Sequence, residues 1–211
     1  MDQSAVWLKA QKEESRKFFS HKDVTESGPL VAICHGDCWI NNILFHYNDA
    51  GDAADDVRLV DWQIILPQNP GRDYYHFLAS STTTELRKEC GQELLEHYAT
   101  TFISALTKLG VPLEDEGIDQ QFVIKHVQKE INFGLVMGMV MLPAMLDTSM
   151  TTKLEEMGKD EETANKAKTD DNGMEFFNEA QDALTVDVIL ANELLCNRIV
   201  DFVEEFRALL Q

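Results

Sequence analysis

Residues 34–45 read CHGDCWINNILF, and this stretch decides how the rest of the chain is interpreted. It places a His, an Asp and two Asn beside two cysteines and ahead of a strand-like apolar run. Three kinds of structure fit such a loop: a metal site, a turn between two strands, or the catalytic loop of an enzyme. The flanking segments distinguish these possibilities.

The composition is that of an ordinary globular protein with a strong acidic excess. The chain has 211 residues, of which 44% are hydrophobic and 26% charged, and its formal net charge is -19. These fractions exclude a disordered tail. The negative charge disfavours binding to nucleic acid or anionic lipid, because no stripe of Lys and Arg is present to neutralise phosphates. A phosphate ligand would need cations beside it.

The cysteines and the N-terminal residues point to the cytoplasm. Cys34, Cys38, Cys90 and Cys196 form no CxxC pair and no even spacing, so we interpret them as reduced thiols. The first twenty residues are charged throughout and lack the apolar centre of a signal peptide. The longest apolar run, residues 131–146, is shorter than the roughly 20 residues that cross a bilayer. We expect a cytoplasmic protein without a membrane span.

Short strands are predicted on both sides of the quoted loop. Residues 30–34 form the strand that precedes it, and residues 43–45 form the strand that follows. A third strand, residues 57–61, returns from a connection rich in Asn, Asp and Gly. The loop should therefore lie at an open end of a small sheet, with Asp61 ending the strand that returns to it.

The second half of the chain has helical patterns. Apolar residues spaced by threes and fours predict a helix of about seven turns that stops at Gly110, with Thr82 and Glu85 as its capping box. Further helices are expected over about 119–146 and 184–210, the second with Leu194 on its apolar face.

Two polar segments lie outside this pattern. Residues 1–24 are expected to form a leading helix, over 5–19, and a turn. Residues 147–180 are acidic and should be mobile, because they lack the apolar area that would offset ordering. Residues 25–211 then make up one lobe that contains this acidic segment.

Asp37, Asn42 and Asp61 form a set that suits phosphoryl transfer. One carboxylate can orient the attacking hydroxyl and accept its proton, while an amide and a second carboxylate hold Mg2+ on nucleotide phosphates. The cation would also let an acidic protein bind ATP. Asp37 and Asn42 could instead be turn residues that bond local backbone. The string HGDxxxxN, followed by strand, turn, strand and Asp, favours the catalytic interpretation.

Other residues of the loop have structural interpretations. His35 is expected to pack beneath the loop and bond backbone, and Gly36 to supply the freedom for a sharp bend. A zinc site is disfavoured, although two Cys, a His and an Asp lie together, because structural zinc needs ligand pairs at two separate places. The loop cysteines are expected to be packing residues.

The loop resembles the catalytic loop of the choline kinase and aminoglycoside phosphotransferase group, which is related to the protein kinases. VDWQ, residues 60–63, resembles the metal-binding segment of these enzymes. Trp39 with the doubled Asn, the hairpin into LVDWQ, and GRDYYHFLASS at residues 71–81 make the chain similar to the ecdysteroid kinase-like (CHK kinase-like) family. The similarity covers about residues 25–150 well and the tail loosely.

This resemblance implies roles for individual residues. Asp37 becomes the catalytic base, Asn42 and Asp61 become Mg2+ ligands, and His35 supports the loop. Asp73 becomes a brace for the loop backbone, with a plain helix N-cap as the alternative.

The resemblance also implies a substrate class. The family acts on small hydroxylated lipophilic molecules, with ecdysteroids as the precedent, and uses ATP and Mg2+. Trp39 and Asn41 either face that substrate or pack the loop. The Met- and Gly-rich residues 133–145 either line its pocket or belong to the core.

The implied fold is α+β and mainly helical: the C-terminal lobe of a protein-kinase-like fold, with a small β-hairpin that carries the active site. Only some thirty residues precede the loop, where this group has an N-terminal lobe with a nucleotide-covering loop and a phosphate-pairing Lys. Lys9, Lys12, Lys17 and Lys22 have no strand or Gly-rich loop beside them. We therefore expect the N-terminal lobe to be absent here, which exposes apolar surface for association.

Two functions remain open at this point. The first is an ATP- and Mg-dependent phosphotransferase that acts on a hydroxyl of a small lipophilic molecule, with slight or no turnover by this chain alone. The second is a catalytically silent kinase-like module that binds a lipophilic ligand or a protein partner. Neither involves nucleic acid.

Overall fold

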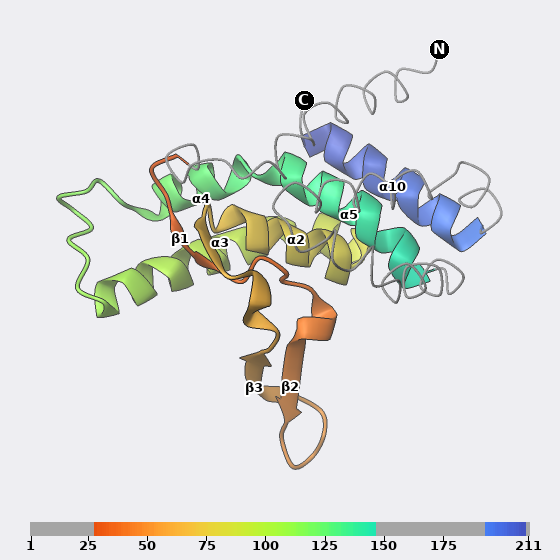
Figure 1. Cartoon of the computed structure of the whole chain (residues 1–211), viewed down its shortest axis with the longest axis horizontal. Helices are drawn as coiled ribbons and strands as arrows, with labels where there is room; N and C mark the ends of the chain where they lie inside the picture. Colours follow the sequence, from red (N-terminus) through yellow and green to blue (C-terminus); the bar gives the residue numbers. More distant parts are fainter. Residues whose placement is uncertain (1–27, 147–192, 210–211) are drawn as a thin grey trace, which may run out of the picture. The chain divides into compact units, whose positions relative to one another are not determined.

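The computed structural model describes residues 28–146 and 193–209 (Figure 1). The chain divides into two compact units, one of residues 23–134 and one of residues 1–22 with 135–211. The described residues are mostly helical with two small antiparallel sheets, which confirms the expected mixed, mainly helical class. The opening helix predicted at 5–19 and the acidic segment 147–180 lie outside the described residues.

Two short sheets adjoin the quoted loop. The first pairs β1 (Ala32–Cys34) with β4 (Leu66–Gln68). The second pairs β2 (Ile43–Tyr47) with β3 (Ala54–Leu59). We call β2, β3 and their connection, residues 43–59, the ribbon; it extends away from the helices of its own unit (Figure 1). The predicted hairpin after the loop is therefore present.

The third strand differs from its predicted bounds. β3 ends at Leu59 and not at Asp61, and β4 was not expected. Asp61 adopts left-handed backbone angles, φ 64° and ψ 58°, which end the extended conformation. The short 3-10 helix η3 (Trp62–Ile64) follows immediately. Asp61 consequently lies in the connection between the two sheets.

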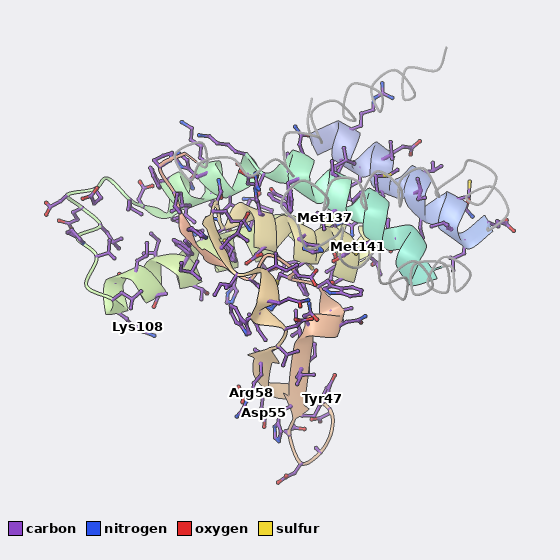
Figure 2. All side chains as sticks on the ribbon, viewed as in Figure 1. Tyr47, Asp55, Arg58, Lys108, Met137 and Met141 are labelled. Atoms are coloured by element: carbon purple, nitrogen blue, oxygen red, sulfur yellow. The ribbon has the colours of Figure 1, made fainter. Side chains whose placement is uncertain are left out.

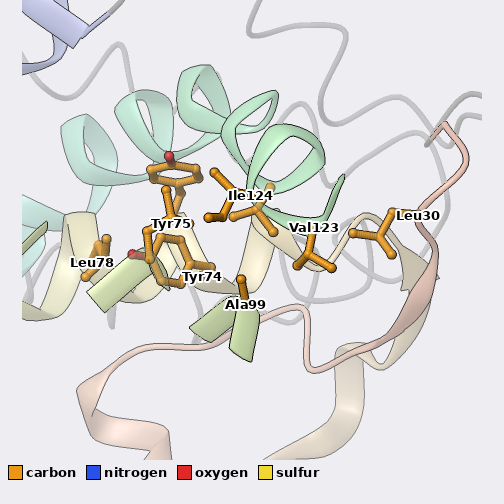
Figure 3. Close-up of a cluster of buried hydrophobic side chains, with 9 residues drawn as sticks. Leu30, Tyr74, Tyr75, Leu78, Ala99, Val123 and Ile124 are labelled. Atoms are coloured by element: carbon orange, nitrogen blue, oxygen red, sulfur yellow. The ribbon is translucent and has the colours of Figure 1, made fainter. Parts of the chain in front are cut away.

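The helices of the first unit pack around one hydrophobic core. They are α2 (Gly71–Ser81), α3 (Thr84–Lys108), α4 (Gln120–Gln128) and the start of α5 (Ile131–Leu146). The core also includes Leu30, two residues before β1, so it reaches the start of the strand that leads into the loop (Figure 3). Its buried members are Leu30, Tyr74, Tyr75, Leu78, Leu95, Ala99, Val123, Ile124 and Val127.

Helix α3 has the predicted length but begins one residue later than its predicted capping box. Thr83 is the N-cap, and its hydroxyl accepts a hydrogen bond from the Leu86 N–H at 3.3 Å. Thr82 instead ends α2, and its carbonyl accepts a bond from the buried Arg87 at 2.7 Å. The predicted capping box of Thr82 and Glu85 is therefore wrong, because Thr82 ends α2 at the tight corner between the two helices.

The helical region predicted over 119–146 is two helices. Asp119 caps α4, since its carboxylate accepts the N–H three residues on at 2.7 Å. The last turn of α4 then tightens, because Lys129 and Glu130 donate to carbonyls only three residues back. Helix α5 begins directly afterwards at Ile131.

Helices α2 and α4 approach closely at Gly71. A Cβ at this position would lie 2.5 Å from the Val127 carbonyl oxygen and 2.9 Å from its Cα. The buried Asn69 joins the same two helices: its Nδ2 donates to the His126 carbonyl, and its Oδ1 accepts the Gly71 N–H, each at 2.9 Å. A residue without a side chain is therefore required at Gly71.

The second unit is described for residues 135–146 and 193–209. Helix α10 (Glu193–Leu209) buries Leu195, Ile199, Phe202, Val203 and Phe206. Leu194, which was predicted on this face, is exposed, because Leu195 takes the buried position. The predicted start of this helix, at about 184, lies outside the described residues.

The Met- and Gly-rich helix behaves as core where its side chains are described. Phe133, Leu135, Val136 and Met137 are buried, and a Cβ at Gly138 would collide with the Phe202 ring. The alternative that these residues line a ligand pocket stays a prediction. Among the helices described, none is both long and apolar enough to cross a membrane.

The close approach at Gly71 predicts opposite effects for two Gly to Ala variants. Gly71→Ala should lower the free energy of unfolding by about 1–3 kcal/mol, because the new methyl meets backbone atoms. Gly91→Ala, in the open middle of α3, should raise it by up to about 1 kcal/mol. Urea denaturation of both variants measures this. A Gly71→Ala variant as stable as the parent would contradict the packing.

Candidate functional site

A single carboxylate holds the start of the HGD loop. Asp73, in the first turn of α2, accepts the His35 N–H at 2.6 Å through Oδ2 and the Gly36 N–H at 3.0 Å through Oδ1. The helix N-cap is Pro70, so the alternative that Asp73 is a plain N-cap is wrong. Asp73 makes the contacts that a loop brace requires, and the brace role stays a prediction.

Gly36 allows the loop to turn away from β1. Its φ is +84°, in the left-handed region that favours glycine. A Cβ would also collide with the Ile64 carbonyl oxygen. The predicted bend at Gly36 is therefore confirmed, for two independent reasons.

The His35 ring lies buried beneath the loop and joins it to the chain that precedes Asp61. Its Nδ1 accepts the Asp37 N–H at 3.3 Å, and its Nε2 bonds to the Val60 carbonyl at 2.8 Å. Because Nδ1 accepts, the proton belongs on Nε2, which then donates to Val60. The Trp62 ring covers the imidazole, with ring centroids 4.6 Å apart.

Asp37 and Asn42 are in direct contact. The Asn42 Nδ2 donates to the Asp37 backbone carbonyl and to its Oδ2, each at 2.9 Å. Asn42 is buried at the end of the 3-10 helix η2 (Ile40–Asn42), while Asp37 is half-buried. The amide nitrogen is thus used within the loop, which leaves the amide oxygen for another partner.

Asp61 is connected to this pair through the residue before it, Val60. The Val60 N–H donates to the Asn42 carbonyl at 3.0 Å, and the Val60 carbonyl accepts from His35. Asp61 itself is exposed and within 3.5 Å of the Gln63 amide nitrogen. Within the described residues no hydrogen bond joins it to Asp37 or Asn42, so the structure brings Asp37 and Asn42 into contact and links Asp61 to them only through Val60.

Trp39 and Asn41 differ in exposure. Asn41 is exposed, and Trp39 is half-buried with an indole N–H that has no partner among the described residues. Ile40 between them is held by Ser81, whose hydroxyl accepts its N–H at 2.9 Å. Whether Trp39 and Asn41 face a substrate stays a prediction. The sequence did not indicate Ser81, because a Ser that ends a helix carries no distinctive pattern.

The two loop cysteines are shielded from solvent, Cys34 fully and Cys38 in part. Burial raises the pKa of both Cys34 and Cys38 to about 12, so both thiols stay protonated near neutral pH. Cys34 is buried and donates weakly to the Gln68 carbonyl, with 3.6 Å between sulfur and oxygen. Within 28–146 and 193–209, no three His, Cys, Asp or Glu side chains gather as a metal group. The side-chain oxygens of Asn42 and Asp61 remain as possible metal ligands. Oxygen ligands suit Mg2+ when phosphate oxygens complete its coordination shell.

Comparison with known proteins supports the sequence resemblance. The family model described as the ecdysteroid kinase-like family matches residues 7–111, about half of the chain and the whole of the loop, ribbon and α2. The chain belongs to the ecdysteroid kinase-like family. The description of this family is kinase-like.

A curated protein is similar to a shorter segment of this chain. The uncharacterized oxidoreductase dhs-27 of Caenorhabditis elegans is 29% identical over 69 residues. The aligned segment is 31% of this chain and 8% of that protein, so the chain spans a small part of its relative. No solved structure matches the chain.

The Asp73 clamp predicts a large loss of stability on its removal. Asp73→Ala leaves two N–H groups of the loop without an acceptor, which should lower the free energy of unfolding by about 2–4 kcal/mol. Asp115→Asn, at an exposed site after α3, should change it by less than about 0.5 kcal/mol. Denaturant titrations compare the two. Equally small changes in the free energy of unfolding of the two variants would contradict a role of Asp73 in holding the loop.

The raised pKa of Cys34 predicts a dependence of stability on pH. An unfolded thiol ionises near pH 8.5–9, whereas the folded one stays protonated to about 12. The folded state is therefore favoured below pH 9, and this stabilisation is lost as pH rises from 9 towards 12. The free energy of unfolding of the parent should fall more between pH 8 and 10 than that of Cys34→Ala. Parallel curves would contradict the burial of the thiol.

Proposed function

We propose that the chain supplies the catalytic half of an ATP- and Mg2+-dependent kinase that phosphorylates a hydroxyl of a small lipophilic, ecdysteroid-like molecule. The observation that carries this proposal is the Asp37–Asn42 contact in a loop clamped by Asp73. Family membership supports the reaction type in general. The substrate class and the cofactors belong to the proposal.

Asp37 is the proposed catalytic base. Asn42 bonds one of its carboxylate oxygens, and within the described residues no hydrogen bond reaches the other. That oxygen is available to orient the acceptor hydroxyl and take its proton as the phosphoryl group arrives. The bond from Asn42 fixes the carboxylate rotamer, which favours one orientation of the acceptor.

Asn42 and Asp61 are the proposed Mg2+ ligands. The amide nitrogen of Asn42 is held by Asp37, so its oxygen faces elsewhere, and the Asp61 carboxylate is exposed. The chemistry of this donor set fits a hard cation that keeps water and phosphate oxygens as its other ligands. When bound, the ion would neutralise phosphate charge. Val60 keeps the two ligands in a fixed relation, because both of its backbone groups are bonded.

A lipophilic acceptor is supported by the apolar side chains that adjoin the loop. Trp62 lies on the His35 ring and is partly exposed, and Ile64 and Ile65 after it are exposed as well. Apolar surface beside a catalytic carboxylate suits a substrate whose reactive hydroxyl is its main polar group. Trp39 and Asn41 are proposed to contact the same molecule.

We further propose that turnover requires a nucleotide-covering lobe, which the described residues do not include. Phosphoryl transfer depends on positioning, and a covering loop with a phosphate-pairing Lys contributes a large part of it. This chain alone should then bind Mg-ATP weakly and turn over slowly.

The test joins the chain to the N-terminal lobe of an ecdysteroid kinase-like protein and measures ATP consumption with a panel of hydroxylated steroids. Asp37→Asn should lower kcat by about 100-fold to 10,000-fold, because it removes the base. Asp49→Asn, at the exposed tip of the ribbon, should leave kcat within about twofold of the parent. The comparison isolates the catalytic carboxylate from a change in net charge.

Two outcomes would sink the kinase proposal. The first is ATP consumption that survives Asp37→Asn. The second is steroid binding without any nucleotide binding by the joined protein, which would favour a silent binding module. Mg2+ titration under the same conditions separates these outcomes, since only the kinase requires the ion.

A further inference from the structure

Helix α2 holds the HGD loop at two points, one at the start of the loop and one near its end. The Asp73 carboxylate accepts two N–H groups at the start, and the Ser81 hydroxyl accepts the Ile40 N–H at 2.9 Å. Residues 37–39, which include the proposed base, lie between these two points. The stretch of α2 from Asp73 to Ser81 therefore runs along the segment that carries the catalytic carboxylate.

His76 lies within this stretch of α2. It follows Asp73 by three residues and precedes Ser80 by four, so the three residues share one face of the helix. The Ser80 hydroxyl donates to the His76 carbonyl at 2.7 Å and lies 3.1 Å from the Ser81 hydroxyl that holds the loop. His76 is consequently between the two points at which α2 bonds the loop.

The His76 ring is buried, yet no protein atom among the described residues bonds its nitrogens. The residue is 1% exposed, and both Nδ1 and Nε2 lack a hydrogen-bond partner within the described part of the chain. Its ring meets that of Phe133 edge to face, with centroids 6.5 Å apart, so this neighbour is apolar. On the ribbon, the polar side chains of Tyr47, Asp55 and Arg58 lie away from α2 (Figure 2). Buried polar groups in native proteins are nearly always bonded, so a partner other than these side chains is required.

The ring is neutral near pH 7. Burial lowers the pKa of His76 below its usual 6.5, and this outweighs the Asp37 and Asp73 carboxylates, which raise it, while His35 lowers it further. A neutral imidazole has one nitrogen that donates and one that accepts. The influence of Asp37 and His35 also agrees with the placement of this ring beside the loop.

Trp39 has a matching requirement on the loop side. It precedes Ile40, which Ser81 holds, and its indole N–H is buried without a partner among the described residues. An indole N–H can only donate. Within the described part of the chain, the loop and the helix that supports it therefore each present buried polar atoms that the protein does not satisfy.

We propose that His76 and Trp39 hold buried water between α2 and the HGD loop. Water can donate to the accepting nitrogen of His76 and accept both from its other nitrogen and from the Trp39 indole, and a buried water typically makes about three such bonds. At 1% exposure His76 is closed to larger ligands, whereas water needs little space. The exposed part of the half-buried Trp39 stays available to a substrate.

The water gives His76 a positioning role, and this part of the inference rests on the proposed function. Direct bonds from α2 fix the loop at its start and at Ile40, while water fixes the segment between them. A bridging water is enthalpically nearly as favourable as a direct bond, and phosphoryl transfer depends on the position of the base. Loss of the polar atoms of His76 should therefore slow the chemical step without weakening acceptor binding.

NMR spectroscopy of the isotope-labelled whole chain tests the hydration site without any catalysis. The Trp39 indole N–H, identified as the signal that Trp39→Phe removes, should show a rotating-frame Overhauser contact with water, whose sign distinguishes it from proton exchange. The Trp62 indole N–H is an internal reference, because it donates to the Leu59 carbonyl at 3.0 Å. A parent chain without a water contact at Trp39 would overturn the proposal.

Two substitutions separate the polar atoms of His76 from its volume. His76→Phe keeps a buried ring but removes both nitrogens, so it should abolish the water contact of Trp39 and leave the Trp62 signal unchanged. His76→Gln keeps a donor and an acceptor and should retain the contact. His97→Phe, the same change at an exposed position of α3, is the matched control and should have no effect. A water contact that survives His76→Phe would contradict a shared site.

The positioning role is tested in the protein joined to a kinase N-terminal lobe. His76→Phe should lower kcat about tenfold and change KM by less than about threefold, while His76→Gln should recover most of the loss and His97→Phe should match the parent. A kcat unchanged by His76→Phe, or lowered equally by His76→Gln, would overturn this role.

Two further controls keep the outcomes distinct. Circular dichroism checks that each variant is folded, and if His76→Phe does not fold, His76→Leu removes the same nitrogens and makes the same test. If the joined parent has no activity, the proposed function fails and the positioning role fails with it. The NMR result on the chain alone still decides whether His76 and Trp39 share buried water.

Discussion

One interaction ties the start of the loop to the helices, because the Asp73 carboxylate accepts two loop N–H groups. His35 and Gly36 have no helix or sheet to bond their N–H groups at this sharp bend, and a charged acceptor supplies the stronger kind of hydrogen bond. Asp73 is itself fixed, because α2 is packed into the core through Tyr74, Tyr75 and Leu78. The hydrophobic core thus sets where the loop begins.

From that point a chain of local contacts assembles the remaining residues. The His35 ring bonds the Asp37 N–H within the loop and the Val60 carbonyl after the ribbon, and Asn42 closes the loop onto Asp37. Val60 is shared by both ends of this arrangement. None of these bonds is strong alone. Together they join Asp37 to Asn42 and tie both to Val60, the residue before Asp61.

The sequence predicted the parts of this arrangement that follow from local pattern. The strand before the loop, the hairpin after it, the bend at Gly36 and the length of α3 all rest on alternation, spacing or a single glycine, and the structure has them. The N-cap of α3 was predicted one residue too early, because two neighbouring residues can both cap the helix. Thr82 and Thr83 are equally good caps by type, and only the α2–α3 corner decides between them.

Long-range relations were harder to predict. The pairing of β1 with β4, the close approach at Gly71 and the support of Ile40 by Ser81 depend on contacts across the fold, which no local pattern encodes. The left-handed backbone of Asp61 was also not predictable, because an Asp after a hydrophobic run usually continues or ends a strand.

The bonds of Val60 have a mechanical consequence. Asn42 is the residue before β2, and Val60 is the residue after β3, so the bond between them is the first rung of the ribbon. The base of the ribbon is accordingly formed by residues that adjoin the candidate site. The ribbon therefore continues through backbone alone into Asn42 at one end and towards Asp61 at the other, whereas His35 and Gly36 are held by Asp73 of α2.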